Sequence, residues 1–122
     1  MRCVMLSYCR TIASCCAVSA CSCSVALSSS PLSSVTVFCV NRDLKEDYEL
    51  EIDLRSFTDE KTQKSLQLQE HILLHNDDVN AVNTEENPDN VRPAAGPGGT
   101  VDGGRACIRI PALSWNVLRF VP

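Results

Sequence analysis

The sequence predicts an all-β fold: a partial antiparallel β-sandwich with a long loop rich in proline and glycine, preceded by a separate N-terminal segment. Three observations support this prediction. Residues 48–54 alternate between apolar and charged side chains, which is the period-two pattern of a strand with one buried face. Short apolar runs bounded by polar turn residues recur along the rest of the second part of the chain. No segment has the length and period of a convincing helix.

A change in composition near residue 34 divides the chain. Residues 1–34 contain six of the eight cysteines and no acidic residue, whereas residues 35–122 carry mixed charges. Four interpretations of the first part are open: a secretory signal peptide, a bacterial lipoprotein signal that would be lipidated at Cys21, a cysteine metal site, and sequence foreign to the domain, from a wrong start or a shifted frame. The cysteines concerned are Cys3, Cys9, Cys15, Cys16, Cys21 and Cys23. We therefore predict a single domain over residues 35–122.

Five strands are expected, at residues 35–41, 48–54, 66–75, 105–110 and 113–120. The first run is apolar on both faces, which suits a strand in the middle of a sheet, and it forms a candidate hairpin with the second run. In the third run, Glu70 interrupts the alternation that would bury Ile72 and Leu74, and a β-bulge near Glu70 would restore the register. Pro111 separates the last two strands because it has no N–H to donate to a sheet ladder.

A long loop, residues 76–104, separates the third expected strand from the fourth. It contains three prolines and all five glycines of the chain, and it has no clear period. Such loops are uncommon inside a compact domain, and they usually have a function or pack on a part that is absent. We therefore expect this loop to contact another part of a larger protein.

Size and charge argue against several classes of protein. The 122 residues cannot hold a (β/α)8 barrel, which needs about 250 residues. The net charge is −4, with no basic cluster, so we expect no nucleic-acid partner. No segment reaches the about 20 apolar residues of a transmembrane helix, so we expect no membrane partner. Cytoplasmic and secreted locations are both compatible with the sequence.

Four short motifs, in order along the chain, resemble the C-terminal domain of family 51 α-L-arabinofuranosidases. They are Asn41-Arg42-Asp43 after an apolar strand, the loop Asn83-Thr84-Glu85-Glu86-Asn87-Pro88, the pair Val91 and Pro93, and the closing Ser114-Trp115-Asn116-Val117. The resemblance covers about residues 35–120. Four motifs in order are more specific than any one of them alone.

The resemblance implies retaining hydrolysis of terminal α-L-arabinofuranosyl residues from hemicelluloses. It places the two catalytic glutamates on a (β/α)8 barrel that precedes this domain, and neither has a matching position here. We therefore expect a truncated tail with an incomplete sandwich, inactive alone, whose loop at residues 83–93 packs on the barrel. Arabinose-containing polysaccharide would be reached only through that barrel. The alternative is a non-catalytic carbohydrate-binding or interaction module.

The acidic residues are candidates for a catalytic pair, because retaining glycosidases need two carboxyl groups about 5 Å apart across the scissile bond. Glu49 and Glu51 share one strand face roughly 7 Å apart and are interpreted as a solvated face. Glu85 and Glu86 are neighbours in the loop, where the resemblance implies a structural role for Glu86. We therefore predict no catalytic residue in this chain.

The histidines suggest a metal site only if their segment is helical. His71 and His75, with Asp77 and Asp78 close behind, would meet on a helix because they are four residues apart. On a strand the two rings lie about 13 Å apart. Because the segment is predicted to be a strand, we expect no metal site. The glycine-rich residues 96–104 lack the lysine and helix of a phosphate-binding loop, so we expect no cofactor.

Four other side chains have two interpretations each. Cys39 and Cys107 would pair if their strands face each other, although buried thiols are the commoner arrangement. Trp115 could stack on a sugar ring, but its apolar strand favours a core position. Arg42, beside Asp43 at a strand end, could belong to a ligand site, but a salt-bridged turn is the favoured interpretation.

Overall fold

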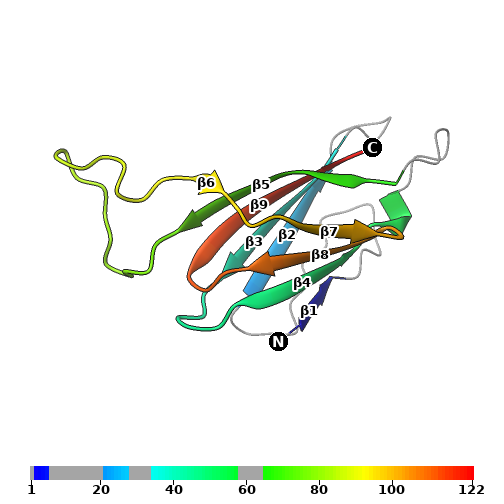
Figure 1. The fold of residues 1–122 in the computed structure, drawn as a ribbon, viewed down its shortest axis with the longest axis horizontal. Coiled ribbons are helices and arrows are strands. Elements are labelled where there is room, and N and C mark those ends of the chain that lie inside the picture. Colours follow the sequence, from blue (N-terminus) through cyan, green and yellow to red (C-terminus); the bar gives the residue numbers. More distant parts are fainter. Residues whose placement is uncertain (1, 6–20, 28–33, 58–64) are drawn as a thin grey trace.

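The computed structural model describes residues 2–5, 21–27, 34–57 and 65–122 (Figure 1). The described chain consists of strands joined by loops, and its one helical element is a single 3-10 turn. The elements are β1 (Arg2–Met5), β2 (Cys21–Leu27), β3 (Val35–Asn41), β4 (Tyr48–Asp53), η1 (Arg55–Phe57), β5 (Gln67–His75), β6 (Ala94–Ala95), β7 (Gly99–Asp102), β8 (Arg105–Ile110) and β9 (Ser114–Val121). The predicted all-β class is confirmed.

The strands form the two layers of a β-sandwich. One sheet has four strands in the order β1-β4-β8-β7, and the other has five in the order β2-β3-β9-β5-β6. All pairs are antiparallel except β1 with β4, which is parallel. β9 is the central strand of the five-stranded sheet, between β3 and β5.

Two strands lie within residues 1–34, the segment that composition sets apart from the domain. β2 pairs with β3 from Cys21 opposite Asn41 to Leu27 opposite Val35, and β1 pairs with β4. Each therefore extends one sheet by a strand. Residues 6–20 and 28–33 lie outside the described residues, and so does most of the stretch on which the signal and metal interpretations rest. The domain boundary at residue 34 stays a prediction.

The predicted hairpin between residues 35–41 and 48–54 is wrong. β3 and β4 belong to different sheets, and the loop between them crosses from one layer to the other. Alternate side chains of both strands are fully buried, so the two strands face each other across the core instead of pairing edge to edge. Burial of alternating residues identifies a strand but does not choose its partner.

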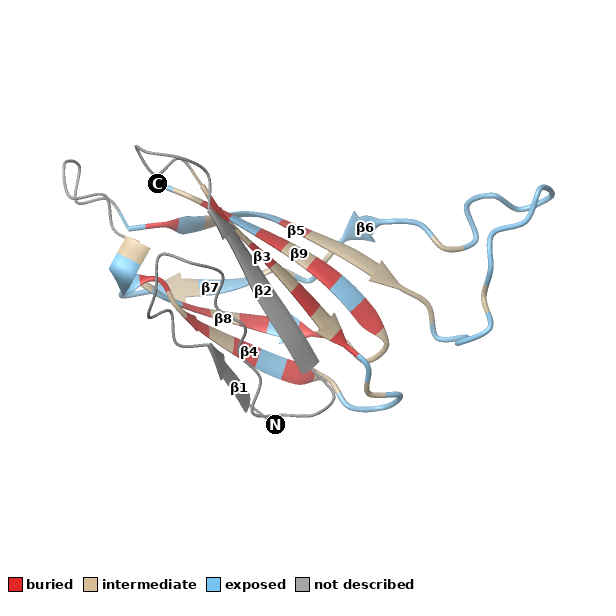
Figure 2. Cartoon of the chain, turned by 180° about the vertical axis from the view of Figure 1, so that it is seen from behind, coloured by how far each residue is buried: buried red, intermediate tan, exposed pale blue. Residues whose placement is uncertain are grey.

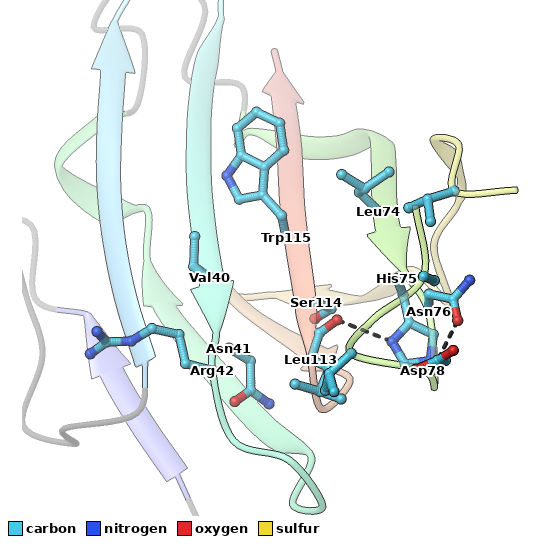
Figure 3. Close-up of a pocket in the computed structure, with 13 residues that line it drawn as sticks. Val40, Asn41, Arg42, Leu74, His75, Asn76, Asp78, Leu113, Ser114 and Trp115 are labelled. Carbon is cyan, nitrogen blue, oxygen red and sulfur yellow. Dashed lines mark hydrogen bonds between the residues drawn. The ribbon is translucent and has the colours of Figure 1, made fainter. Parts of the chain in front are cut away.

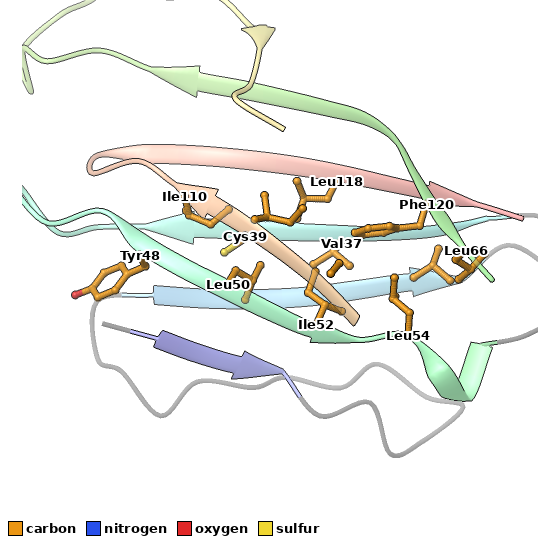
Figure 4. Packing of buried hydrophobic residues seen from close by; sticks show 13 residues of the cluster. Val37, Cys39, Tyr48, Leu50, Ile52, Leu54, Leu66, Ile110, Leu118 and Phe120 are labelled. Atoms are coloured by element: carbon orange, nitrogen blue, oxygen red, sulfur yellow. The ribbon is translucent and has the colours of Figure 1, made fainter. Parts of the chain in front are cut away.

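The core fills the space between the two sheets (Figure 4). Each sheet contributes one face, because side chains alternate in direction along every strand. Its buried apolar members are Val35, Val37, Cys39, Tyr48, Leu50, Ile52, Leu54, Leu66, Ala106, Ile108, Ile110, Leu118 and Phe120. The predicted strand at residues 105–110 is confirmed as β8, and Ala106, Ile108 and Ile110 are buried in one phase of it.

A β-bulge in β5 changes which side chains face the core. The register against β9 shifts between Leu68 and Glu70, so the predicted bulge near Glu70 is confirmed. The apolar pattern predicts that Ile72 and Leu74 face the core, but the bulge has the opposite effect. The extra residue turns His71 toward the core, where its exposure is 7%, and places Ile72 and Leu74 opposite the outward-facing side chains of β9.

The predicted loop at residues 76–104 consists of two parts. Residues 76–93, which we call the arm, contain no strand and project away from the sandwich (Figures 1 and 2). The remainder includes β6, which pairs with β5, and β7, which pairs with β8. After the arm, the chain therefore runs first along the edge of the five-stranded sheet, as β6, and then along the edge of the four-stranded sheet, as β7.

Candidate functional site

A cleft of about 400 Å³ lies between the five-stranded sheet and the base of the arm (Figure 3). The ends of β3 and β5, the start of β9 and the first residues of the arm all contribute to it. Its lining residues are Val40, Asn41, Arg42, Leu74, His75, Asn76, Asp78, Val79, Ala81, Val91, Leu113, Ser114 and Trp115. The cleft thus combines an apolar floor with a polar rim.

Trp115 stands on the floor of this cleft and not in the core, so the predicted core position is wrong. It is 47% exposed, although it belongs to the central strand of its sheet. The reason is the phase of β9, in which Ser114, Asn116, Leu118 and Phe120 face inward and the intervening residues face outward. Trp115 pairs with Val40 on β3 and with Leu74 on β5, so two apolar side chains flank its indole.

This row continues into an apolar surface that we call the outer face of the five-stranded sheet. The next outward residue of β9, Val117, pairs with Phe38 and with Ile72. The outer face is defined by Phe38, Val40, Ile72, Leu74, Trp115 and Val117, none of which is among the buried core residues. Cross-strand apolar neighbours of this kind form a continuous patch.

The polar rim is built around His75. Its Nδ1 donates to the carbonyl of Leu113 at 3.2 Å, because a carbonyl can only accept. Its Nε2 lies 3.2 Å from Oδ1 of Asp77. Leu113 has a positive φ of 48°, which turns its carbonyl toward the histidine in the tight connection between β8 and β9. The rim thus ties the start of the arm to the turn before Trp115.

The Asn41-Arg42-Asp43 motif holds together the loops at this end of the sandwich. The buried Asn41 amide donates to the carbonyls of Glu46 at 2.9 Å, Pro111 at 3.0 Å and Ile110 at 3.3 Å. The Asp43 carboxylate accepts from the backbone N–H groups of Lys45 and Glu46, and these bonds lower its pKa. Arg42 lines the cleft. The motif therefore fixes the crossing between the sheets.

A buried polar network lies beneath the cleft, and sequence reasoning missed it. Gly98 N–H donates to Nδ1 of His71 at 3.1 Å, so Nε2 carries the proton and donates to Oδ1 of Asn116 at 2.8 Å. Asn116 then donates to Oγ of Ser114 at 2.8 Å, and Ser114 donates to the carbonyl of Pro111. The signal in the sequence that could have revealed this network is the presence of polar residues at inward-pointing strand positions. The network joins β5, β9 and the segment that follows the arm.

The arm is ordered by its own asparagine side chains. Asn83 forms two hydrogen bonds with the backbone of Val91: its Oδ1 accepts at 2.6 Å and its Nδ2 donates at 2.9 Å. Asn90 donates to the carbonyl of Val82 at 3.1 Å. These side-chain amides replace the backbone ladder of a hairpin. The arm therefore holds a defined shape while Val79 and Val82 stay 64% and 63% exposed.

The carboxylates considered as catalysts lie away from the cleft. Glu49 and Glu51 are on β4, where Glu51 forms an ion pair with Arg105 at 3.7 Å. Glu85 and Glu86 are exposed in the arm. Of the described residues, Asp78 is the one carboxylate that lines the cleft.

Two further aspartates on the four-stranded side are held ionised by their partners. The Arg55 guanidinium donates to Asp53 and lowers its pKa to about 2. The pKa of Asp47 is lowered by the backbone N–H of Ala112 and by Arg109. These carboxylates are engaged in holding loops and strands together.

The other candidate residues are separated in space. His71 and His75 lie on a strand, as predicted, with His71 in the buried network and His75 at the rim. Cys39 is buried, Cys107 is a half-buried thiol, and the two do not pair with each other. Within the described part of the chain, no three His, Cys, Asp or Glu side chains gather as metal ligands would. Among the same residues, no helix has the length and apolar character needed to cross a membrane.

Comparisons with known proteins point to one family. The model of the α-L-arabinofuranosidase C-terminal domain matches residues 10–114. The intracellular exo-α-(1→5)-L-arabinofuranosidase of Halalkalibacterium halodurans is 33% identical over 85 residues, which are 70% of this chain and 15% of that protein. The corresponding enzyme 1 of Bacillus subtilis is 35% identical over 85 residues, with the same shares. The chain therefore spans less than a fifth of the length of these relatives.

Solved structures agree with the sequence match. A family 51 α-L-arabinofuranosidase from Bifidobacterium longum has a TM-score of 0.69 and 29% identity, over 84% of this chain and 19% of that one. The family 51 arabinofuranosidase of Xanthomonas axonopodis pv. citri has a TM-score of 0.70 over the same shares, with an identity of 21% that supports the fold alone. The family model, relatives and structures agree with the four motifs noted in the sequence, and this chain belongs to the family of α-L-arabinofuranosidase C-terminal domains.

Proposed function

We propose that this chain serves as the accessory, non-catalytic domain of an α-L-arabinofuranosidase, and that hydrolysis takes place on a (β/α)8 barrel elsewhere in that enzyme. The observation that carries the proposal is the mismatch between the family match and the available acids. The match covers most of the chain, yet among the residues that the structure describes Asp78 is the one carboxylate that lines the cleft. A retaining glycosidase needs two, about 5 Å apart.

The role of the domain in that enzyme is structural. It buries its own core between two sheets and leaves the outer face of the five-stranded sheet, with the arm beside it, available to a partner. We propose that the barrel is that partner and that arabinose-containing polysaccharide is bound by the barrel. The side chains of Asn83 and Asn90 bond to the backbone of the arm itself, so a partner would meet a preformed surface.

Two assays test this function. The purified chain is incubated with 4-nitrophenyl α-L-arabinofuranoside, and we expect no turnover above background; turnover at enzyme-like rates would refute the proposal. In the second assay, the matched 85-residue segment of the Bacillus subtilis relative is replaced by the corresponding residues of this chain. We expect this chimera to hydrolyse the substrate, and a variant that lacks the segment to be less active or less stable. A chimera no better than the deletion would contradict the proposal.

The exposed tryptophan favours a second candidate, a carbohydrate-binding module. Trp115 lies on the floor of an open cleft, with Asp78, Asn76 and His75 on its rim, and an aromatic ring beside polar groups is a common way to hold a sugar. Affinity electrophoresis in arabinoxylan gels tests it. Binding would slow the chain, and Trp115→Ala would restore its mobility. Equal mobility with and without polysaccharide would exclude this candidate.

A further inference from the structure

We propose that the outer face of the five-stranded sheet and the arm together form the docking surface for the catalytic barrel. We further infer that the barrel surface which meets them presents an apolar patch beside a cluster of basic side chains. This inference rests on the proposed function and adds to it the contact residues and the chemistry of the partner.

The first argument is the difference between the two outer surfaces of the sandwich. The outer face of the five-stranded sheet carries six neighbouring apolar side chains across three strands, with Trp115 on the middle strand. On the four-stranded sheet, Arg105 of β8 forms an ion pair with Glu51 of β4, and Arg109 of β8 forms one with Asp47, the residue before β4. Contiguous apolar patches rimmed by polar residues are typical of interaction sites. Aromatic anchors such as tryptophan contribute most to such contacts.

The second argument is the charge of the arm. Residues 76–93 contain five acidic residues and one arginine, so the arm carries a formal charge of −4, which equals the net charge of the whole chain. The formal charges of all residues outside the arm therefore sum to zero. Electrostatic complementarity sets the orientation of partners, so the surface that receives the arm is expected to be basic. The acidic residues are Asp77, Asp78, Glu85, Glu86 and Asp89.

The third argument is that the arm is ordered without burying its apolar groups. The asparagine contacts of Asn83 and Asn90 fix its shape, while Val79 and Val82 stay exposed. Preorganised segments bind with a smaller loss of conformational entropy. Val79 and Val91 also line the cleft beside Trp115, so the arm and the outer face form one continuous surface.

The choice of occupant follows from charge and size. A second copy of this chain would offer the acidic arm a surface without a basic cluster, because the formal charges outside residues 76–93 sum to zero. In the curated relatives, by contrast, 85 matched residues make up only 15% of the protein, so a far larger body is covalently attached to this domain. The outer layer of a (β/α)8 barrel consists of helices, which can present an apolar stripe with flanking basic side chains.

Hydroxyl-radical footprinting tests the docking surface in the chimera described above. Trp115 is the only tryptophan of this chain, and mass spectrometry follows its oxidation in the isolated chain and in the chimera. We expect oxidation to slow about fivefold or more in the chimera, because residues at the centre of an interface lose nearly all their accessible surface. The footprint does not depend on turnover, so it reports on docking whether or not the chimera is active.

Variants of the chimera separate the two parts of the surface. Trp115→Ala is expected to lower the melting temperature of the isolated chain by about 2 °C and that of the chimera by about 5 °C or more. The pair Glu85→Lys with Glu86→Lys is expected to leave the isolated chain within about 1 °C and to lower the melting temperature of the chimera by about 2 °C or more. The matched control is Thr100→Lys, an exposed position on β7 in the other sheet, which is expected to change neither.

The outcomes distinguish the two proposals. An active chimera whose Trp115 oxidises as fast as in the isolated chain would overturn the docking surface and leave the proposed function standing. An inactive chimera with a protected Trp115 would overturn the proposed function and leave the docking surface standing. If Trp115 is already protected in the isolated chain and size-exclusion chromatography shows a dimer, the occupant is a second copy and the proposal is wrong.

Discussion

The outer surfaces of the two sheets have the same strand geometry but present different kinds of side chain. On the four-stranded sheet, the side chains that point away from the core are largely charged, and Arg105 and Arg109 of β8 form ion pairs with Glu51 and Asp47. On the five-stranded sheet, the same alternation presents apolar residues, with Trp115 at the centre. A face made of ion pairs is stable in water, whereas a contiguous apolar face indicates a contact.

This difference shows that the alternation of side chains along a strand does not by itself identify which face of the strand is buried. Both phases of β9 contain apolar residues, and only the packing between the sheets decides which phase forms the core. If this comparison is correct, substitutions should be costly on the inner phase, moderate in the network and loop contacts, and small on the outer face of the isolated chain. Four substitutions test this order.

The largest effect is expected for Phe120→Ala. Phe120 is on the inner phase of β9 and fully buried, so its loss removes apolar contacts and leaves a cavity, at a cost of about 3–5 kcal/mol in the free energy of unfolding. Urea denaturation followed by circular dichroism measures it. A cost below about 1 kcal/mol would mean that the inner phase is not the core.

The next effect is expected for His71→Leu. The leucine would fill the space but would leave the N–H of Gly98 and Oδ1 of Asn116 without their partner, at a cost of about 2–4 kcal/mol for two buried polar groups. The same denaturation experiment measures it, with Asn116→Leu added as a double variant. If the cost of the double variant equals the sum of the costs of His71→Leu and Asn116→Leu measured singly, the two residues are independent and the network is not a unit.

A smaller effect, about 1 kcal/mol, is expected for Asp47→Asn, which keeps the shape but weakens the bonds to Ala112 N–H and Arg109. The pKa of Asp47 is lowered in the folded chain, so its contribution is fully present above the unfolded value of about 3.9 and is lost as the pH falls through the folded value.

The pH dependence therefore provides the measurement for Asp47. Asp53, with a pKa of about 2, and Asp43 behave in the same direction, so stability of the natural chain should fall from about pH 5 toward pH 2. Asp47→Asn should reduce this fall and cost little at pH 2. A steeper fall in the variant would show that Asp47 is not a stabilising carboxylate.

The smallest effect in the isolated chain is expected for Trp115→Ala, about 0.5 kcal/mol, because half-exposed surface positions contribute little to folding. This is the same strand as Phe120, so the pair of variants compares the two phases directly. A cost of about 3 kcal/mol would place Trp115 in the core after all, and the outer face could not then be a docking surface.

Much of the fold could be predicted from the sequence, because strands can be recognised from the local pattern of apolar and polar side chains. The alternation in β4, the inward phase of β8 and the bulge near Glu70 all follow from residues next to one another. The resemblance to the arabinofuranosidase C-terminal domain likewise rests on four local motifs. What the sequence could not supply was pairing over distance, and so the hairpin prediction for β3 and β4 is wrong.

The site was harder to predict than the fold for the same reason. Trp115 and Phe120 are both aromatic residues in an apolar strand, and nothing local tells which one faces inward. His71 is buried only because the bulge inverts the phase of β5, and its partners Gly98 and Asn116 are far away in the sequence. The network and the cleft emerge when both sheets are assembled.

The arm has one further consequence, for the handling of the protein by proteases. It leaves β5 after His75 and returns at β6, whose two residues pair with Ile72 and Leu73, and exposed loop tips are preferred sites of cleavage. A cut between these points would leave the strands on either side hydrogen-bonded within their sheets. A nicked chain would thus stay folded, and a second cut would release part of the arm together with its negative charge. The rate of nicking would report whether the arm is covered.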